Sequence, residues 1–264
     1  MARHTAINSL NRSLETPSPT LHFHWGVVAI FLVAAILTVP FDVQLARLFA
    51  DGLLPGELRR AIHKAEAFGH IYGVLGIVIT LYLVCVDQRR KLARLLSTAI
   101  LAGLVADMIK MLVCRVRPLY FSFEEGASTF RGFSFLSADS AEQIFDSQFQ
   151  SFPSAHTAVA VGFALALGAM FPRAARWFLI LAAACAASRF DGGAHYVSDT
   201  LIGALVGYGC AVWTMGDTRL AARFSRYERA TPEQWGFWSP WPNQSTGIST
   251  GTVADAKWPR AEMS

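Results

Sequence analysis

The stretch that decides the fold is WFLILAAACAASRFDGGAHYVSDTLIGALVGYGCAVW, Trp177–Trp213. Two apolar runs in it flank SRFDGGAHYVSD, Ser188–Asp199, which contains an arginine, two aspartates and a histidine. Ionisable side chains beside membrane-type apolar segments are energetically costly, so their presence indicates a functional site. The alternative is an ordinary polar turn between two helices.

The composition is typical of a membrane protein. Of the 264 residues, 53% are hydrophobic and 16% are charged, whereas soluble domains contain about 25% charged residues. The apolar runs are too long for strands and do not alternate with polar residues. They predict an all-α fold, a polytopic membrane bundle of six transmembrane helices. The runs cover approximately Phe23–Val39, Ile71–Val86, Leu95–Val113, Thr157–Phe171, Trp177–Ala187 and Thr200–Trp213.

The distribution of charge predicts the orientation of the chain. Basic residues cluster after the second, fourth and sixth runs, and the positive-inside rule places these connections and both termini in the cytoplasm. Because the basic residues lie between apolar runs rather than on one solvated face, no nucleic-acid partner is expected. The four cysteines show no CxxC spacing, so a zinc site is not expected either.

These features divide the chain into three parts. We expect a cytoplasmic N-terminal tail over residues 1–22, a six-helix membrane domain over 23–216, and a cytoplasmic C-terminal tail over 217–264 that is partly disordered. An extended connection, Cys114–His156, joins the third and fourth runs on the non-cytoplasmic side. Its recurring phenylalanines indicate either anchoring at the membrane interface or packing over the bundle. We expect the inner (plasma) membrane of a bacterium.

The first polar cluster on the non-cytoplasmic side is KMLVCRVRP, Lys110–Pro118. Lys110 and Arg117 are seven residues apart, so on a helix they lie two turns apart on one face. Two cations on one face make an anion site. The alternative is an i, i+3 pair of Lys110 with Asp107, with Arg117 extending to the lipid headgroups.

The second cluster is SFPSAHTAVA, which precedes an apolar run. Ser154 is a favoured N-cap residue, and the unpaired amides of a helix start bind phosphate readily. His156 lies in that first turn and can reach a group held by the amides. The alternative is a cap and a solvated histidine without any chemistry.

The third cluster is the stretch that opens this section. His195 and Asp199 are four residues apart, one helical turn if a helix begins near Ala194. The carboxylate can then accept the imidazole Nδ1–H, which leaves the other nitrogen free as a nucleophile. Alone, such a pair is commonly a surface contact. Asp191 has no evident role beyond capping or pairing with a nearby basic residue.

Together, the clusters supply the parts of a phosphoryl-transfer site. Lys110, Arg117 and Arg189 are cations, and a helix start, two histidines and a carboxylate accompany them. Cations and amides neutralise phosphate oxygens while one group attacks and another protonates the leaving oxygen. A purely structural account does not explain why all the parts lie on one side of the membrane.

The three clusters resemble the signature of the type 2 phosphatidic acid phosphatase superfamily. KMLVCRVRP, PSAH and SRFDGGAHYVSD correspond to KxxxxxxRP, PSGH and SRxxxxxHxxxD. The resemblance implies a membrane phosphatase that needs no metal or other cofactor. It implies phosphate binding by Lys110, Arg117, Ser154, Ala155 (through its amide) and Arg189, attack by His195, proton transfer by His156, and orientation of His195 by Asp199.

One position departs from the signature. Ala155 replaces the family glycine, and its methyl group is expected to crowd the phosphate side and to exclude a positive φ. We expect this to affect substrate size more than the type of reaction.

Membrane embedding favours a lipid phosphate as the substrate, hydrolysed at the non-cytoplasmic face with membrane lipids around the protein. The candidates are phosphatidic acid, phosphatidylglycerol phosphate, an isoprenyl diphosphate and a lipid A phosphate. Three alternatives remain: a lipid phosphotransferase of the same superfamily, a vanadate-dependent haloperoxidase-like enzyme, and an anion transporter. We expect lipid to enter laterally between helices near the phenylalanine-rich connection.

Overall fold

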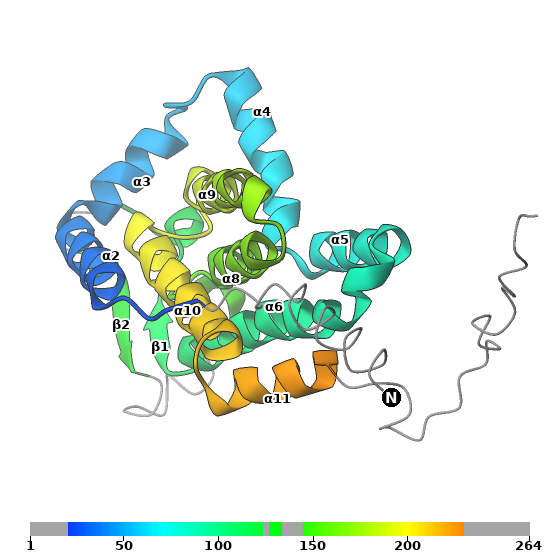
Figure 1. The fold of residues 1–264 in the computed structure, drawn as a ribbon. Helices are drawn as coiled ribbons and strands as arrows, with labels where there is room; N and C mark the ends of the chain where they lie inside the picture. Colours follow the sequence, from blue (N-terminus) through cyan, green and yellow to red (C-terminus); the bar gives the residue numbers. More distant parts are fainter. Residues whose placement is uncertain (1–20, 124–126, 134–144, 230–264) are drawn as a thin grey trace, which may run out of the picture. The chain divides into compact units, whose positions relative to one another are not determined.

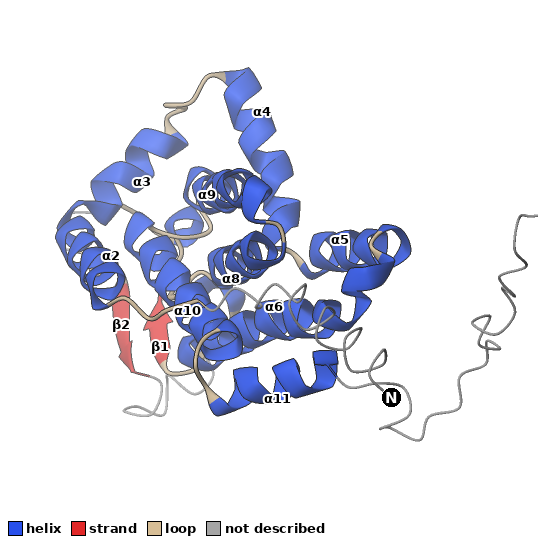
Figure 2. Cartoon of the chain, in the orientation of Figure 1, coloured by secondary structure: helices blue, strands red, loops and turns tan. Residues whose placement is uncertain are grey.

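Each of the six apolar runs forms a helix in the computed structural model (Figures 1 and 2). The structure describes residues 21–123, 127–133 and 145–229. The helices are α2 (Trp25–Thr38), α5 (Ile71–Val84), α6 (Arg89–Lys110), α8 (Ala155–Met170), α9 (Ala175–Asp191) and α10 (Val197–Met215). The sequence therefore located the principal helices to within a few residues at most ends.

Among the described residues, three helical segments are long and apolar enough to cross a membrane. They are Trp25–Ala50, Val86–Lys110 and Val197–Met215, and the bent pair Gly56–Gly69 and Ile71–Val84, with 71° between its parts, makes a fourth if it counts as one span. By length and composition, the prediction of membrane-type helices is therefore confirmed for these segments.

Helix α8 is the centre of the bundle, with α6, α9 and α10 packed around it (Figure 1). The contact between α8 and α10 uses very small residues. A Cβ atom added at Gly207 would lie 2.3 Å from the Ala158 carbonyl oxygen and 2.9 Å from the Gly162 nitrogen. Small residues allow helix backbones to approach closely where lipid offers no hydrophobic driving force.

Three further helices of the described residues were not predicted. The connection between the first two runs contains α3 (Asp42–Ala50) and α4 (Gly56–Ala65), and the predicted C-terminal tail begins with α11 (Arg219–Arg229). Buried Arg94 of α6 donates to Ser225 Oγ of α11 at 2.8 Å. The remaining parts of the two predicted tails, residues 1–20 and 230–264, lie outside the described residues.

The interpretation of Lys110 and Arg117 as one helix face is wrong. Helix α6 ends at Lys110, and β1 (Val113–Arg115) pairs antiparallel with β2 (Phe130–Phe133). Arg117 is extended, with φ −70° and ψ 148°, because the ring of the following Pro118 disfavours helical backbone at that position. The described part of the chain is thus mostly helical, with one short two-stranded sheet. Residues 124–126 and 134–144 of the phenylalanine-rich connection lie outside the described residues.

A buried ion pair network connects this sheet to the helices. The Arg115 side chain is 1% exposed and its Nη2 lies 2.8 Å from Asp42 Oδ2 of α3. Nη1 bonds Asp199 Oδ1 of α10 and donates to Ser198 Oγ at 2.8 Å. The guanidinium carbon lies 4.2 Å from the Tyr196 ring centroid. Desolvated charges require such partners, so Arg115 fixes β1, α3 and α10 relative to one another.

Replacing Arg115 tests this network. We expect Arg115→Ala to lower the free energy of unfolding by about 3–5 kcal/mol, because two buried carboxylates lose their cation. The control is Arg131→Ala on the exposed neighbouring strand, which should change stability by no more than about 0.5 kcal/mol. Denaturant titration in detergent micelles measures both. Equal effects of the two substitutions would contradict the structural role of Arg115.

Candidate active site

A tight turn between α9 and α10 delivers His195 to the site. Gly193 has φ +67°, a conformation that favours glycine, and its carbonyl oxygen accepts from the Leu119 nitrogen at 2.9 Å. The His195 nitrogen donates to the Arg189 carbonyl oxygen at 3.1 Å. Helix α10 begins at Val197, three residues later than expected, so His195 lies in the turn rather than on the helix.

His195 is 2% exposed, and its Nδ1 lies 2.5 Å from the carbonyl oxygen of Ser151. A carbonyl oxygen can only accept, so Nδ1 carries the hydrogen of the neutral ring and Nε2 keeps its lone pair. The prediction that Asp199 accepts this hydrogen is wrong, because the acceptor is the carbonyl oxygen of Ser151. Asp199 Oδ2 instead accepts from Ser151 Oγ at 2.6 Å and from the Tyr196 nitrogen at 2.9 Å. Asp199 therefore supports His195 through Ser151.

The structure brings the three predicted cations near His195. Burial lowers the pKa of His195 well below its ordinary value, and the charges of Lys110, Arg189 and Arg117 lower it further. The hydrogen bond to Ser151 acts in the opposite direction. The ring is therefore neutral near pH 7, and the neutral imidazole is the nucleophilic form.

Two of these cations have donors that no protein group uses. The Nε atoms of Arg117 and Arg189 are buried without a hydrogen-bond partner in the described part of the chain. Buried unpaired donors are uncommon in native proteins and indicate a ligand or water at that place. Lys110 Nζ lies 3.2 Å from Asp107 Oδ1, so the predicted i, i+3 pair exists alongside its proximity to His195.

Helix α8 begins as the sequence predicted. Ser154 is the N-cap, and its Oγ accepts from the Thr157 nitrogen at 3.4 Å. Ala155 is the first helical residue and His156 the second. Because no positive φ is required at Ala155, the alanine in place of the family glycine does not strain the backbone there. The His156 side chain is 28% exposed.

Glu66 is a residue of the site that was not predicted. It lies in the short 3₁₀ turn Glu66–Gly69 after α4. Its Oε1 bonds Arg189 Nη1 and lies 3.8 Å from His156 Nε2. Ser151, Asp42 and Arg115 were not identified either. These four residues reach the site through contacts with residues far apart in the sequence, and nothing in the local pattern distinguishes their side chains from ordinary loop residues.

An apolar groove of about 290 Å³ reaches His156 from the side of the bundle. It lies between α5, α6 and α8, and Ala155 and His156 at the end of the phenylalanine-rich connection line it. Its lining residues are Gly69, His70, Ile71, Ala99, Ile100, Gly103, Leu104, Asp107, Ala155, His156 and Val159. Such a groove can hold an apolar chain while the attached polar group lies near His156.

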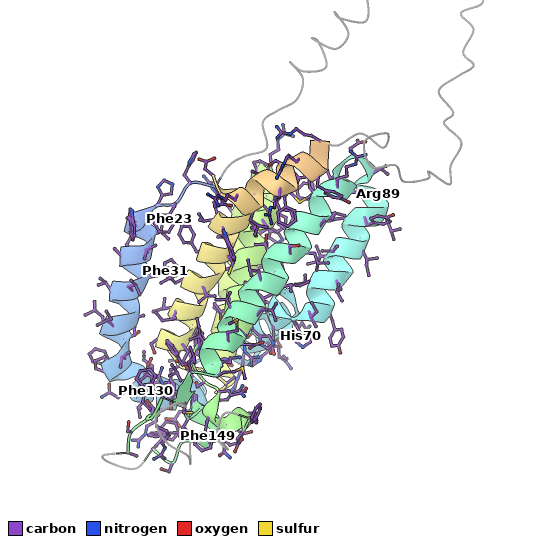
Figure 3. All side chains as sticks on the ribbon, turned by 90° about the horizontal axis from the view of Figure 1, so that it is seen from below. Phe23, Phe31, His70, Arg89, Phe130 and Phe149 are labelled. Carbon is purple, nitrogen blue, oxygen red and sulfur yellow. The ribbon has the colours of Figure 1, made fainter. Side chains whose placement is uncertain are left out.

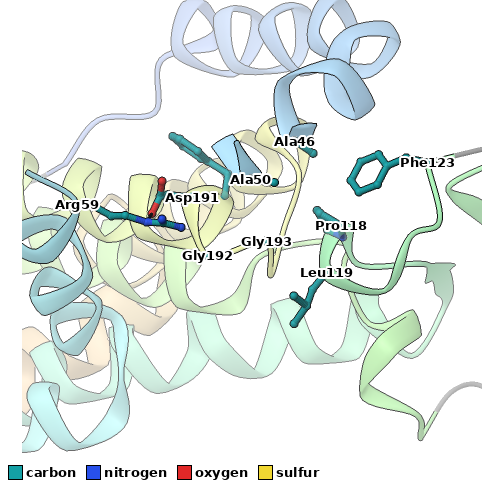
Figure 4. Close-up of a pocket in the computed structure, with 10 residues that line it drawn as sticks. Ala46, Ala50, Arg59, Pro118, Leu119, Phe123, Asp191, Gly192 and Gly193 are labelled. Atoms are coloured by element: carbon teal, nitrogen blue, oxygen red, sulfur yellow. Dashed lines mark hydrogen bonds and ion pairs between the residues drawn. The ribbon is translucent and has the colours of Figure 1, made fainter. Parts of the chain in front are cut away.

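A second pocket, of about 320 Å³, lies beside the Gly192–Gly193 turn (Figure 4). Asp191 lies at this pocket, and its buried Oδ2 is 2.8 Å from both Arg59 Nε and His63 Nε2 of α4. Asp191 therefore pairs with basic residues, as expected, and holds α4 against the end of α9.

A close backbone contact between α10 and α8 also sets the position of His156. A Cβ atom added at Gly203 would lie 2.4 Å from the Ser154 carbonyl oxygen, whereas one added at Gly209 would meet nothing within 4 Å.

We expect Gly203→Ala to displace the start of α8 and to lower turnover about 10- to 100-fold. Gly209→Ala on the same helix should leave turnover unchanged and raise stability by up to about 1 kcal/mol. Steady-state kinetics and thermal unfolding measure the two effects, and normal turnover by Gly203→Ala would contradict this account of the helix contact.

Comparison with known proteins gives relatives of one kind. Residues 91–221 match the model of the PAP2 superfamily. The chain is similar to a lipid A 1-phosphatase of Rhizobium johnstonii (31% identical over 143 residues, 54% of this chain and 53% of the relative). It is also similar to a lipid A 1-phosphatase of Rhizobium etli (33% identical over 115 residues, 44% of this chain and 45% of the relative). The chain thus matches about half the length of these relatives.

Two solved structures are similar in fold. One is LpxE of Aquifex aeolicus, with TM-score 0.48, 19% identity, and coverage of 65% of this chain and 93% of that one. The other is a transmembrane PAP2 type phosphatidylglycerolphosphate phosphatase of Bacillus subtilis, with TM-score 0.45, 16% identity, and coverage of 70% and 90%. The three signature stretches and the two histidines lie within the segment matched by the family model, and this segment, residues 91–221, belongs to the PAP2 superfamily.

Proposed function

We propose that this protein is an integral membrane phosphatase that hydrolyses the phosphomonoester or diphosphate of a lipid. One observation carries the proposal: His195 is buried close to Lys110, Arg117 and Arg189, its Nδ1 bonds a carbonyl oxygen, and its Nε2 has no hydrogen-bond partner among the described residues. A neutral nucleophile beside several cations suits attack on a phosphate dianion, because the cations neutralise its oxygens.

The reaction proceeds in two steps. In the first, His195 Nε2 attacks phosphorus, the bond from phosphorus to the lipid oxygen breaks, and protonated His156 gives its proton to that oxygen. In the second, His156 accepts a proton from water, the water oxygen bonds phosphorus, and the bond from phosphorus to nitrogen breaks. Asp199 keeps His195 in position through Ser151. Lys110, Arg117, Arg189, Ser154 and the Ala155 amide hold the phosphoryl oxygens.

A lipid is the substrate class that the apolar groove at His156 supports. The polar group lies between the histidines and the cations, and the apolar chain lies between α5, α6 and α8. Because the curated relatives are lipid A 1-phosphatases, a lipid A phosphate is the first candidate. Phosphatidic acid, phosphatidylglycerol phosphate and isoprenyl diphosphates are the others.

In the proposed topology all six apolar helices span the membrane and both termini are cytoplasmic. The N-terminal tail ends at residue 22, and the C-terminal tail begins after residue 216. Figure 3 supports a site on the non-cytoplasmic side, because Phe130 and Phe149 lie at the opposite end of the bundle from Arg89, which belongs to a basic connection. His70, which lies near His156, is closer to the phenylalanine end. The proposed location is the inner membrane of a bacterium, with the site facing outward.

Loss of the nucleophile tests the reaction directly. We expect His195→Ala to release phosphate at least about 10³-fold more slowly than the unmodified protein from a panel of the four candidate lipid phosphates. The protein should still fold, as gel filtration and thermal unfolding in detergent would show. The control, His24→Ala, replaces an exposed histidine and should leave release unchanged.

The same assay separates hydrolysis from phosphotransfer. Release of inorganic phosphate with water as the sole acceptor supports a hydrolase, whereas formation of a phosphorylated product from an added lipid alcohol, without release of inorganic phosphate, supports a phosphotransferase. Near-normal release by His195→Ala would contradict the assignment of the nucleophile.

Filling the groove tests the lipid substrate. Ile100 lines the groove, whereas Met108 of the same helix is exposed and does not. We expect Ile100→Trp to raise KM for a long-chain lipid phosphate about tenfold, since two methylene groups lose burial at about 0.8 kcal/mol each. KM for a short-chain soluble phosphoester should not change, and Met108→Trp should change neither value. An equal rise of KM for both substrates would contradict lipid binding in this groove.

A further inference from the structure

The Glu66 carboxylate occupies a place between two groups of the proposed mechanism. Its Oε1 bonds Arg189 Nη1, a cation proposed to hold phosphate, and lies 3.8 Å from Nε2 of His156, the proposed proton donor. The Glu66 side chain is 34% exposed, so it has room to move. Neither step of the proposed reaction uses this carboxylate.

The backbone on both sides of Glu66 is fixed. Before it, Arg59 and His63 of α4 bind the buried carboxylate of Asp191 at the end of α9, as Figure 4 shows for Arg59. After it, Gly69 packs so closely on α8 that an added Cβ would lie 2.3 Å from the His156 carbonyl oxygen. Motion at Glu66 is therefore confined to its side chain.

A carboxylate and a phosphate compete for the same guanidinium. Both are anions whose oxygens accept charge-assisted hydrogen bonds from arginine, so phosphate bound at Arg189 must displace Glu66. The displaced carboxylate is already close to His156, and a rotation about its side-chain bonds can bring it within hydrogen-bonding distance. In the described part of the chain, the charged or titratable groups near His156 are Arg189, His70, Lys110, Arg117, Cys185, Asp107 and Glu66. Asp107 pairs with Lys110, whereas Glu66 lies 3.8 Å from the His156 ring nitrogen, where its negative charge favours a protonated imidazole.

We propose that Glu66 is a positioning residue that changes partners during the reaction: it holds Arg189 in the free protein and binds the imidazole of His156 once phosphate occupies Arg189. The inference rests on the proposed phosphatase function. It has two consequences. Glu66 weakens the binding of free phosphate, because the two anions compete, and it helps His156 to keep the proton that the lipid oxygen receives.

The test is Glu66→Gln, which removes the charge and keeps the size of the side chain. We expect the inhibition constant of inorganic phosphate to fall severalfold, because the competing anion is gone. We expect kcat for an alkyl lipid phosphate to fall about tenfold, since the proton donor loses support. For p-nitrophenyl phosphate, whose leaving group needs no proton, kcat should fall by less than about threefold.

The matched control is Glu57→Gln on α4, which removes an exposed carboxylate that pairs with Arg60 and should change none of these values. Glu66→Asp keeps the charge with a shorter reach, so it should retain more of the activity on the alkyl substrate than Glu66→Gln, and it serves as the test if the latter does not fold. An unchanged or higher inhibition constant, or equal losses of kcat on both substrates, would overturn the proposal. Wild-type protein that hydrolyses neither substrate would instead refute the phosphatase function itself.

Discussion

The buried guanidinium of Arg115 is the interaction on which the site depends. It lies between Asp42 of α3 and Asp199 of α10, and aromatic rings of Phe130 and Tyr196 lie 4.4 Å and 4.2 Å from its central carbon. A desolvated cation is tolerated only with its counter-charges in place. The arrangement therefore holds the short sheet after α6, the connection after α2 and the start of α10 in one geometry.

This geometry reaches His195 through Ser151. Asp199 shares its two oxygens between Arg115 and the Ser151 hydroxyl, while the Ser151 carbonyl oxygen accepts from His195 Nδ1. A structural ion pair and the proposed nucleophile are thus joined by one serine, with its hydroxyl and its carbonyl in different roles. The consequence is a fixed tautomer at His195, and burial among cations keeps the ring neutral.

The end of α9 and the turn that follows it also make contacts in two directions. Arg189 and His195 face the proposed phosphate position, whereas Asp191 binds Arg59 and His63 of α4. That second contact places the turn after α4, with Glu66, beside Arg189. Each acid near the proposed phosphate position is paired with a basic side chain: Glu66 with Arg189, Asp107 with Lys110, Asp191 with Arg59 and Asp199 with Arg115.

The sequence by itself determined the local features. The apolar runs predicted the helices because burial in lipid demands long apolar segments, and Ser154 predicted the start of α8 because an N-cap is a local hydrogen bond. The spaced cations and histidines indicated phosphoryl transfer and the family. The helical reading of 110–117 failed because the preference of the residue before Pro118 outweighed the apolar pattern.

Only the tertiary structure decided which side chains meet. Asp199 bonds Ser151, 48 residues away, and Arg189 bonds Glu66, 123 residues away. Asp42 meets Arg115 across 73 residues. The number of carboxylates within reach of each cation depends on how the helices pack, and periodicity along one chain carries no information on that packing. The sequence therefore indicated the groups proposed to react, and the fold determined which residues hold them in position.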